Sequence, residues 1–189
     1  MSREARPDFM IIGAAKSATS TLHGALLSAP GIFMTTPKEP AFFSNPAQRS
    51  KGLEWYRSLF EPAAGTDVRG EASTTYSRFP FDTKPNTTSP WPEIAKLFPG
   101  IPLIYLVRHP VDRAFSHYRH WLRNGNRGSF EDAIEIEPPI LDCSRYRSQI
   151  EHVTSVLGDV PIHVETFDRL HADQSGVVDA VRAFLGAGD

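Results

Sequence analysis

Residues Phe9 to Leu22, FMIIGAAKSATSTL, place one lysine and several hydroxyl groups directly after an apolar run. The apolar run predicts a buried strand, and the small residues after it predict a turn into a Ser/Thr-rich helix start. Backbone N–H groups at a helix N-terminus, one lysine and several hydroxyls can together bind an oxyanion. A capped helix with a surface lysine is the alternative for this segment alone. The candidate anion contacts are Lys16, Ser17, Ala18, Thr19, Ser20 and Thr21.

The nucleotide P-loop, GxxxxGK[ST], requires glycines at positions 10 and 15 when Lys16 is its lysine. Met10 and Ala15 stand there instead, so the kinase motif fails in its strict form. A kinase with a degenerate P-loop is therefore kept only as an alternative.

A second segment, LIYLVRHPVDRAFSHYRHW, carries another pair of candidate anion ligands. Its continuous apolar start is typical of a central parallel strand, and a proline at a first helical position predicts a helix after it. Arg108 then lies at the strand's end and Ser116 about two turns into the helix. A guanidinium and a hydroxyl placed in this way can converge on a second phosphate. The alternatives are a structural ion-pair partner for Arg108 and an ordinary helix position for Ser116.

Strands and helices are expected to alternate along the chain. The sequence predicts strands at 9–13, 32–35, 67–71, 102–107 and 161–164, helices at 18–28, 53–60, 111–124, 130–136, 144–157 and 177–185, and a loop at 81–92. This order predicts an α/β fold, a P-loop-like three-layer sandwich with a central parallel sheet flanked by helices. Such sheets bind ligands beyond the carboxyl ends of their strands, so Lys16 and Arg108 are expected to share one ligand.

Composition is that of one ordinary globular domain over residues 1–189, with 40% hydrophobic and 22% charged residues. The single Cys143 cannot form a bridge within the chain, which suits a reducing cytoplasm. A net charge of −2 gives no indication of a nucleic-acid partner. Because no apolar run approaches a leader core or a membrane span, we expect a cytoplasmic protein with no membrane span. The sequence does not indicate the oligomeric state.

Together the two segments resemble the PAPS-dependent sulfotransferases, whose donor is 3′-phosphoadenosine-5′-phosphosulfate (PAPS). The resemblance runs from Phe9 to about Leu185, because SRY at 144–146 and the closing VRAFLG also look like family landmarks. It implies that residues 16–21 bind the 5′-phosphosulfate, with Lys16 at the bridging oxygen, and that Arg108 and Ser116 bind the 3′-phosphate. It also implies PAPS as donor, 3′,5′-ADP as product and no metal.

PKEPAFFS, residues 37–44, resembles the K-E-x-x-F-F segment of the heparan sulfate N- and O-sulfotransferases and their bacterial relatives. The resemblance carries the role of catalytic base to Glu39, and the chemistry needs one because an attacking hydroxyl or amine must lose a proton. A solvated loop pair with Lys38 is the alternative. Phe42 is carried as an acceptor contact, with a core position as its alternative.

GEASTTYSRFP, residues 70–80, resembles the family segment that carries acceptor contacts, which makes Glu71 and Tyr76 candidate substrate-binding residues. Structural roles for both stay open. Ala72 replaces a lysine that is frequent in the heparan-type members, which weakens the case for a polyanionic acceptor. The cytosolic family members use a histidine base instead. Of the candidates for that role, His23, His109, His117 and His120, none lies in a matching motif, so all are expected to be packed or on the surface.

Two departures from the family pattern affect the donor site. Ala18 stands where the family usually has glycine, and the chain ends at Asp189 where many relatives continue into a Gly/Lys-rich stretch. We therefore expect a domain that is short at its C-terminus. The function expected is sulfuryl transfer from PAPS to a hydroxyl or amine of a carbohydrate or other small molecule. A non-catalytic nucleotide-binding module is the alternative from a different class.

Overall fold

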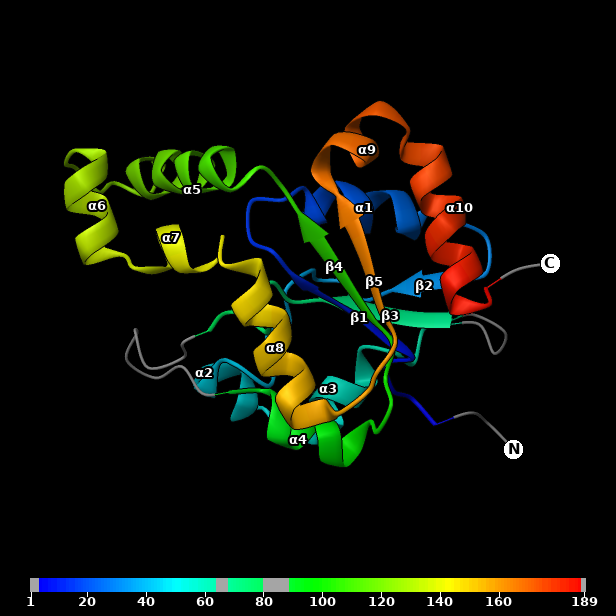
Figure 1. Ribbon diagram of the computed structural model, residues 1–189. Helices are drawn as coiled ribbons and strands as arrows, with labels where there is room; N and C mark the ends of the chain where they lie inside the picture. The colour runs from blue at the N-terminus through cyan, green and yellow to red at the C-terminus, as the bar shows by residue number, and fades with distance from the viewer. Residues whose placement is uncertain (1–3, 64–67, 80–88, 188–189) are drawn as a thin grey trace.

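A five-stranded sheet in the order β2-β3-β1-β4-β5 forms the centre of the protein (Figure 1). The computed structural model describes residues 4–63, 68–79 and 89–187. Every neighbouring pair of strands is parallel, so all the carboxyl ends lie at one edge of the sheet. The strands are β1 (Phe9–Gly13), β2 (Ile32–Met34), β3 (Val68–Ala72), β4 (Leu103–Val107) and β5 (Ile162–Thr166).

Helices cover both faces of this sheet, which confirms the three-layer α/β sandwich expected from the sequence. In Figure 1, α1, α9 and α10 lie on one side of the sheet, while α3, α4 and α8 lie on the other. The described helices are α1 (Thr19–Leu27), α2 (Pro46–Arg49), α3 (Leu53–Ser58), α4 (Trp91–Leu97), α5 (Pro110–Arg123), α6 (Phe130–Ile136), α7 (Pro139–Asp142), α8 (Tyr146–Leu157), α9 (Phe167–Ala172) and α10 (Gln174–Leu185).

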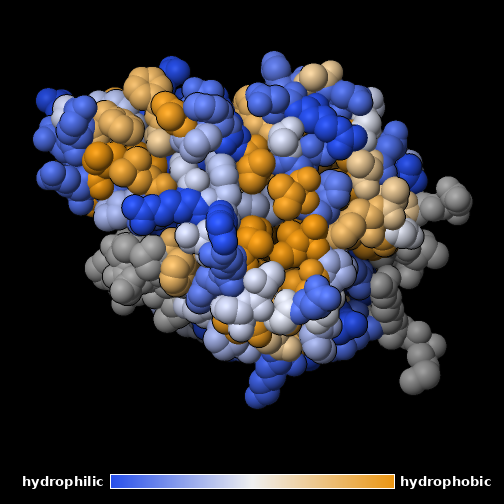
Figure 2. All heavy atoms as spheres, viewed as in Figure 1, coloured by the Kyte–Doolittle hydropathy of each residue, from blue (hydrophilic) through white to orange (hydrophobic). Residues whose placement is uncertain are grey.

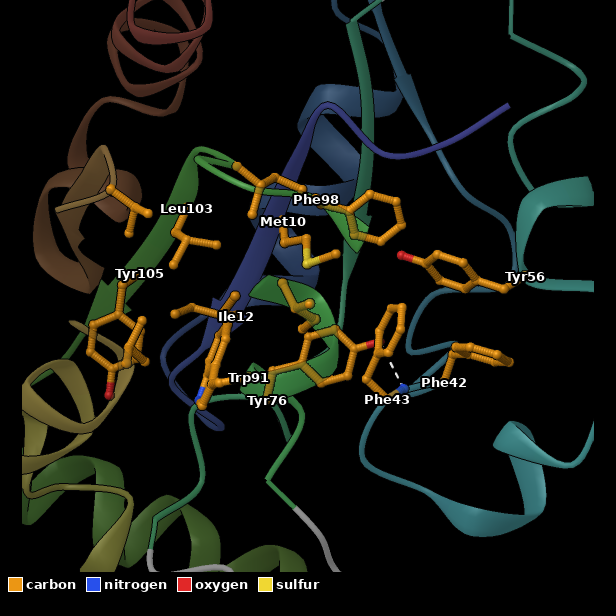
Figure 3. Packing of buried hydrophobic residues seen from close by; sticks show 14 of the residues in the cluster. Met10, Ile12, Phe42, Phe43, Tyr56, Tyr76, Trp91, Phe98, Leu103 and Tyr105 are labelled. Atoms are coloured by element: carbon orange, nitrogen blue, oxygen red, sulfur yellow. Dashed lines mark hydrogen bonds between the residues drawn. The ribbon is translucent and has the colours of Figure 1, made fainter. Parts of the chain in front are cut away.

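The central strand β1 contributes to a hydrophobic cluster on each face, because successive side chains of a strand point to opposite sides. Phe9 and Ile11 pack with the cluster that contains residues of α1, α9 and α10. Met10 and Ile12 pack with the other cluster, which is rich in aromatic rings from α3, α4 and the segment before α2 (Figure 3). All four side chains are fully buried, so β1 is the strand around which both cores are built.

A third group of helices, α5, α6 and α7, extends beyond the carboxyl end of β4 (Figure 1). These helices share a smaller cluster that includes Trp121, Ala133 and Ile140. On the same face of the molecule, apolar side chains gather near the edge strand β5, where Val164 is exposed (Figure 2). No helix within residues 4–63, 68–79 and 89–187 is long and apolar enough to cross a membrane.

The structure corrects several element boundaries. Residues 81–88 of the expected loop lie outside the described residues. Trp91 and Pro92, expected in that loop, begin α4, a helix that was not predicted, and proline is tolerated there because it lies in the first helical turn. Helix α9 was not predicted, and its start is capped by the Thr166 side chain, which accepts from the Arg169 N–H. Helix α10 begins earlier than expected because Asp173 caps it in the same way.

Candidate active site

The loop between β1 and α1 is shaped so that its backbone can receive an anion. Lys16 and Ala18 both adopt left-handed conformations, with φ of 70° and 64°, on either side of Ser17. Alternating right- and left-handed residues turn successive N–H groups toward one point, which forms an anion-binding concavity. The buried Ser17 hydroxyl has no hydrogen-bond partner within the part of the chain that the structure describes. The loop therefore offers donors that the protein itself leaves unused.

A cavity of about 500 Å³ opens beside this loop, at the carboxyl ends of the strands. It brings together residues from the segments that the sequence singled out separately. Its walls include the predicted Lys16, Ala18, Thr19, Ser20, Thr21, Glu39, Arg108 and Ser116, and also Ala15, Lys38, Thr74, Arg78, His117, His120 and Phe167. The predicted Ser17 is fully buried and is not among the residues that line this cavity.

Arg108 and Ser116 both line this cavity. They also line an adjoining cavity of about 340 Å³, together with Arg119 and Arg123. The Arg108 guanidinium carbon lies 4.2 Å from the ring centroid of Phe167, which holds it by a cation–π contact. The hydroxyl of Tyr146 fixes the backbone at Arg108, because it donates to the carbonyl at 2.7 Å and accepts from the N–H at 3.2 Å.

Glu39 lines the same cavity, and Thr74, which follows β3, holds its carboxylate together with Lys38. Its carboxylate accepts from the Thr74 backbone N–H at 3.0 Å and from the Thr74 hydroxyl at 3.0 Å. Lys38 Nζ donates to the same carboxylate at 2.6 Å. The Glu39 backbone has a φ of 60°, a conformation that non-glycine residues adopt rarely and that concentrates at functional sites. Its side chain keeps 35% of its surface exposed, so a ligand can reach the carboxylate.

The charges around Lys16 favour loss of its proton. Partial burial lowers the pKa of Lys16, and the nearby positive charge of Arg123 lowers it further, whereas Glu39 acts in the opposite direction. A cation in this position gains most from a bound anion, which compensates for its desolvation and for its cationic neighbours. Lys16 is therefore in an electrostatic setting that favours binding of negative charge.

Phe42, Glu71 and Tyr76, the three expected acceptor contacts besides Glu39, are packed in the core with no exposed surface. Glu71 accepts from the hydroxyls of Tyr56 at 2.7 Å, Tyr76 at 3.0 Å and Ser73 at 2.8 Å. Burial raises the pKa of Glu71 to about 7. Figure 3 shows both tyrosines among the phenylalanine rings. None of the three expected contacts lines the cavity, so an acceptor would reach them only if this packing opened.

Sequence reasoning missed several residues that line the cavity. His117 and His120 were expected to be packed or on the surface, and both face the cavity, with His117 largely buried. The spacing of Ser116 and His120 offered a signal, since residues four apart share one face of a helix. Thr74 and Arg78 follow β3 as Lys16 follows β1, but no motif marked them. Among the described residues, no group of three or more His, Cys, Asp or Glu side chains is placed to hold a metal ion.

Comparison with known proteins gives one consistent family. The model of the sulfotransferase domain matches residues 6–188. A mouse bifunctional heparan sulfate N-deacetylase/N-sulfotransferase is 27% identical over 201 residues, which cover 95% of this chain and 22% of the mouse protein. A membrane-associated sulfotransferase of Dictyostelium discoideum is 31% identical over 150 residues, covering 74% of this chain and 30% of that protein. The chain thus spans less than a third of the length of these relatives.

Solved structures agree with the sequence matches. A sulfotransferase from Alicyclobacillus acidocaldarius is 29% identical, covers 97% of this chain and 82% of its own, and superimposes with a TM-score of 0.81. A mouse sulfotransferase complexed with PAP is 18% identical, with a TM-score of 0.57 over 100% of this chain and 62% of its own, and shares the fold.

Proposed function

This chain belongs to the sulfotransferase domain family, and we propose that it transfers a sulfuryl group from PAPS to a hydroxyl or amine, releasing 3′,5′-ADP. The observation that carries the proposal is the single cavity whose walls hold Lys16, Glu39, Arg108 and Ser116. It has cationic and hydroxyl groups for a phosphorylated donor and a carboxylate for the attacking group. PAPS supplies the chemistry of the site, an activated sulfuryl group on a phosphate that leaves readily.

The residues present fit such a donor at both of its phosphate-bearing ends. Lys16, the N–H groups around it and the hydroxyl-bearing residues 19–21 match a 5′-phosphosulfate, and Lys16 stabilises the charge that develops on the departing phosphate. Arg108 and Ser116 match the 3′-phosphate, because a guanidinium and a hydroxyl together can bind phosphate oxygens at several points.

Glu39 is the base in this proposal. The acceptor O–H or N–H bond breaks as the new bond to sulfur forms, and the proton passes to a Glu39 carboxylate oxygen. Thr74 and Lys38 hold that carboxylate by three short contacts. These contacts limit its rotation, so the carboxylate keeps one orientation toward the incoming acceptor.

The acceptor we propose is a carbohydrate or another small molecule with a hydroxyl or amine. The names of the heparan sulfate relatives support a carbohydrate acceptor. Glu71 and Tyr76 are buried, so Glu39 is the expected acceptor contact that lines the cavity. The cytoplasmic location expected from the sequence stays a prediction.

Calorimetric titration with 3′,5′-ADP, beside 5′-AMP and ATP-Mg, tests the donor site. Binding that depends on the 3′-phosphate supports the proposal, whereas equal affinity for 5′-AMP, or preference for ATP-Mg, contradicts it. Turnover is then followed as 3′,5′-ADP release from PAPS with a panel of sugar and amine acceptors. Lys16→Ala should lower turnover by about 100-fold or more, since one lost donor at the developing charge has that effect. Lys96→Ala, an exposed lysine on α4, is the matched control.

Glu39→Gln separates base catalysis from binding. The amide keeps the size of the side chain but cannot take a proton, so kcat should fall by roughly 100- to 10,000-fold while affinity for 3′,5′-ADP stays unchanged. An unchanged kcat would place the base elsewhere.

A further inference from the structure

A fully buried arginine connects the lysine loop to the wall of the cavity. Arg113 on α5 donates through Nη1 to the carbonyl oxygen of Ala15, next to Lys16, at 3.2 Å. Its Nε donates to the Ser144 hydroxyl at 2.5 Å, and its Nη2 donates to the Ile140 carbonyl. None of these partners is a carboxylate. The guanidinium is therefore oriented by neutral acceptors, which are two backbone carbonyls and one hydroxyl.

Nη1 of Arg113 also lies 3.2 Å from Nδ1 of His117, which is one helical turn further along α5. A guanidinium has only donors and keeps its proton, so Nδ1 must be the acceptor and carries no hydrogen. The remaining ring proton of the neutral imidazole is then on Nε2. Arg113 thus selects one tautomer of His117 by geometry alone.

The surroundings of His117 keep the ring neutral. Burial lowers its pKa to about 3, and nearby basic groups add to the effect. These groups are Arg113 and His120 on α5, Lys16 after β1 and Arg78 after β3. His117 is 7% exposed and lines the cavity with Lys16. Within the part of the chain that the structure describes, no protein group accepts a hydrogen bond from Nε2.

We propose that His117 donates an Nε2–H hydrogen bond to an oxygen of the transferring sulfuryl group, and that Arg113 is the positioning residue that orients this donor. The inference rests on the proposed sulfuryl transfer and adds to it a second contact beside Lys16. A neutral donor suits this position, because a further full charge among Lys16 and Arg113 would be costly to desolvate. With Nδ1 occupied and Nε2 protonated, His117 cannot act as the base, which is consistent with the proposed role of Glu39.

Product binding separates this role from a structural one, because 3′,5′-ADP has both phosphates but no sulfuryl group. His117→Leu should lower kcat for PAPS turnover by about 100-fold, the effect of losing one donor at the developing charge. It should change the Kd of 3′,5′-ADP by less than about 3-fold, since the binding contacts to phosphate are intact. His117→Gln keeps an N–H donor at nearly the same reach and should recover kcat to within about 10-fold of the wild type. His109→Leu, an exposed histidine at the start of α5, is the matched control and should leave kcat unchanged.

Equal losses of kcat and of 3′,5′-ADP affinity in His117→Leu would overturn the proposal and indicate packing only. An unchanged kcat would also overturn it while leaving the sulfotransferase function intact. If the wild type binds 3′,5′-ADP but turns over no PAPS with any acceptor, both proposals fail. A measurement independent of turnover is nuclear magnetic resonance of ¹⁵N-histidine-labelled wild-type protein. It should show His117 neutral with the proton on Nε2 from pH 5 to 8, and a protonated Nδ1 would contradict the assignment.

Discussion

Replacing Glu71 with glutamine should remove a strong pH dependence from the stability of the protein. The Glu71 carboxyl has no exposed surface, and burial is the largest cause that raises its pKa from the ordinary value of 4.5 to about 7. The hydroxyls of Tyr56, Ser73 and Tyr76 act against this shift, while the charge of Glu39 adds to it. Ionisation of Glu71 therefore costs more in the folded protein than in the unfolded chain.

The sign and size follow from proton linkage. Because the folded state holds this proton more tightly, its contribution to stability is fully present below about pH 4.5 and is lost as the pH rises through about 7. The gap between these two pKa values corresponds to about 3 kcal/mol, at about 1.4 kcal/mol for each pH unit. Between pH 5 and pH 8, we expect most of this change, roughly 2 to 3 kcal/mol, to appear.

Urea unfolding at several pH values measures the effect as a difference between two proteins. The free energy of unfolding of the wild type, minus that of Glu71→Gln, should fall by roughly 2 to 3 kcal/mol from pH 5 to pH 8. Titrating histidines contribute to both proteins and cancel in the difference. Glu54→Gln, an exposed carboxylate on α3, is the control and should give a constant difference. A wild-type curve that stays parallel to that of Glu71→Gln would refute the reasoning.

Three further substitutions test the geometry of the site. Thr74→Val removes the hydroxyl that donates to Glu39 and should lower kcat about 10-fold with unchanged 3′,5′-ADP affinity; a loss of affinity without a loss of kcat would contradict its orienting role. Arg108→Ala should weaken 3′,5′-ADP about 10- to 100-fold in calorimetry and leave 5′-AMP nearly unaffected, and equal effects on both nucleotides would remove Arg108 from the 3′-phosphate. Ala18→Gly should raise the free energy of unfolding by about 0.5–1 kcal/mol in urea, because the left-handed backbone at Ala18 suits glycine, and a lower value would mean that the strain is absent.

The fold was predictable because its signals are local in the sequence. Apolar runs marked the strands, and Pro110 marked the start of the longest helix. Helix α9 was missed because it has only six residues and follows β5 without a loop, so no periodic apolar pattern could develop. Helix α4 was not predicted either, because Trp91 and Pro92 stand next to a proline-rich stretch whose composition favoured a loop. In the structure Trp91 is completely buried in the core.

The site was predictable only in part, because some of its contacts join distant segments. Lys16 and Arg108 could be placed since each directly follows an apolar strand. The bond between Thr74 and Glu39 joins residues 35 positions apart, and nothing in the local spacing indicates it. For Glu71 the sequence indicated the wrong environment, because a glutamate normally faces solvent or a ligand and this one is buried in the core. The hydroxyl of Tyr56, 15 positions earlier in the chain, donates a hydrogen bond to the Glu71 carboxyl group and thereby stabilises it in the core.

The arrangement of the sheet explains why these separate signals converge. After the carboxyl end of each parallel strand comes a residue that lines the cavity. These residues are Lys16 after β1, Glu39 after β2, Thr74 after β3, Arg108 after β4 and Phe167 after β5. In an antiparallel sheet these ends would alternate between two edges and the groups could not meet. The cationic residues at these ends also make the cavity locally positive in a chain whose net charge is −2. An anionic donor is therefore attracted by the position of the charges at one edge of the sheet, which the overall composition does not reveal.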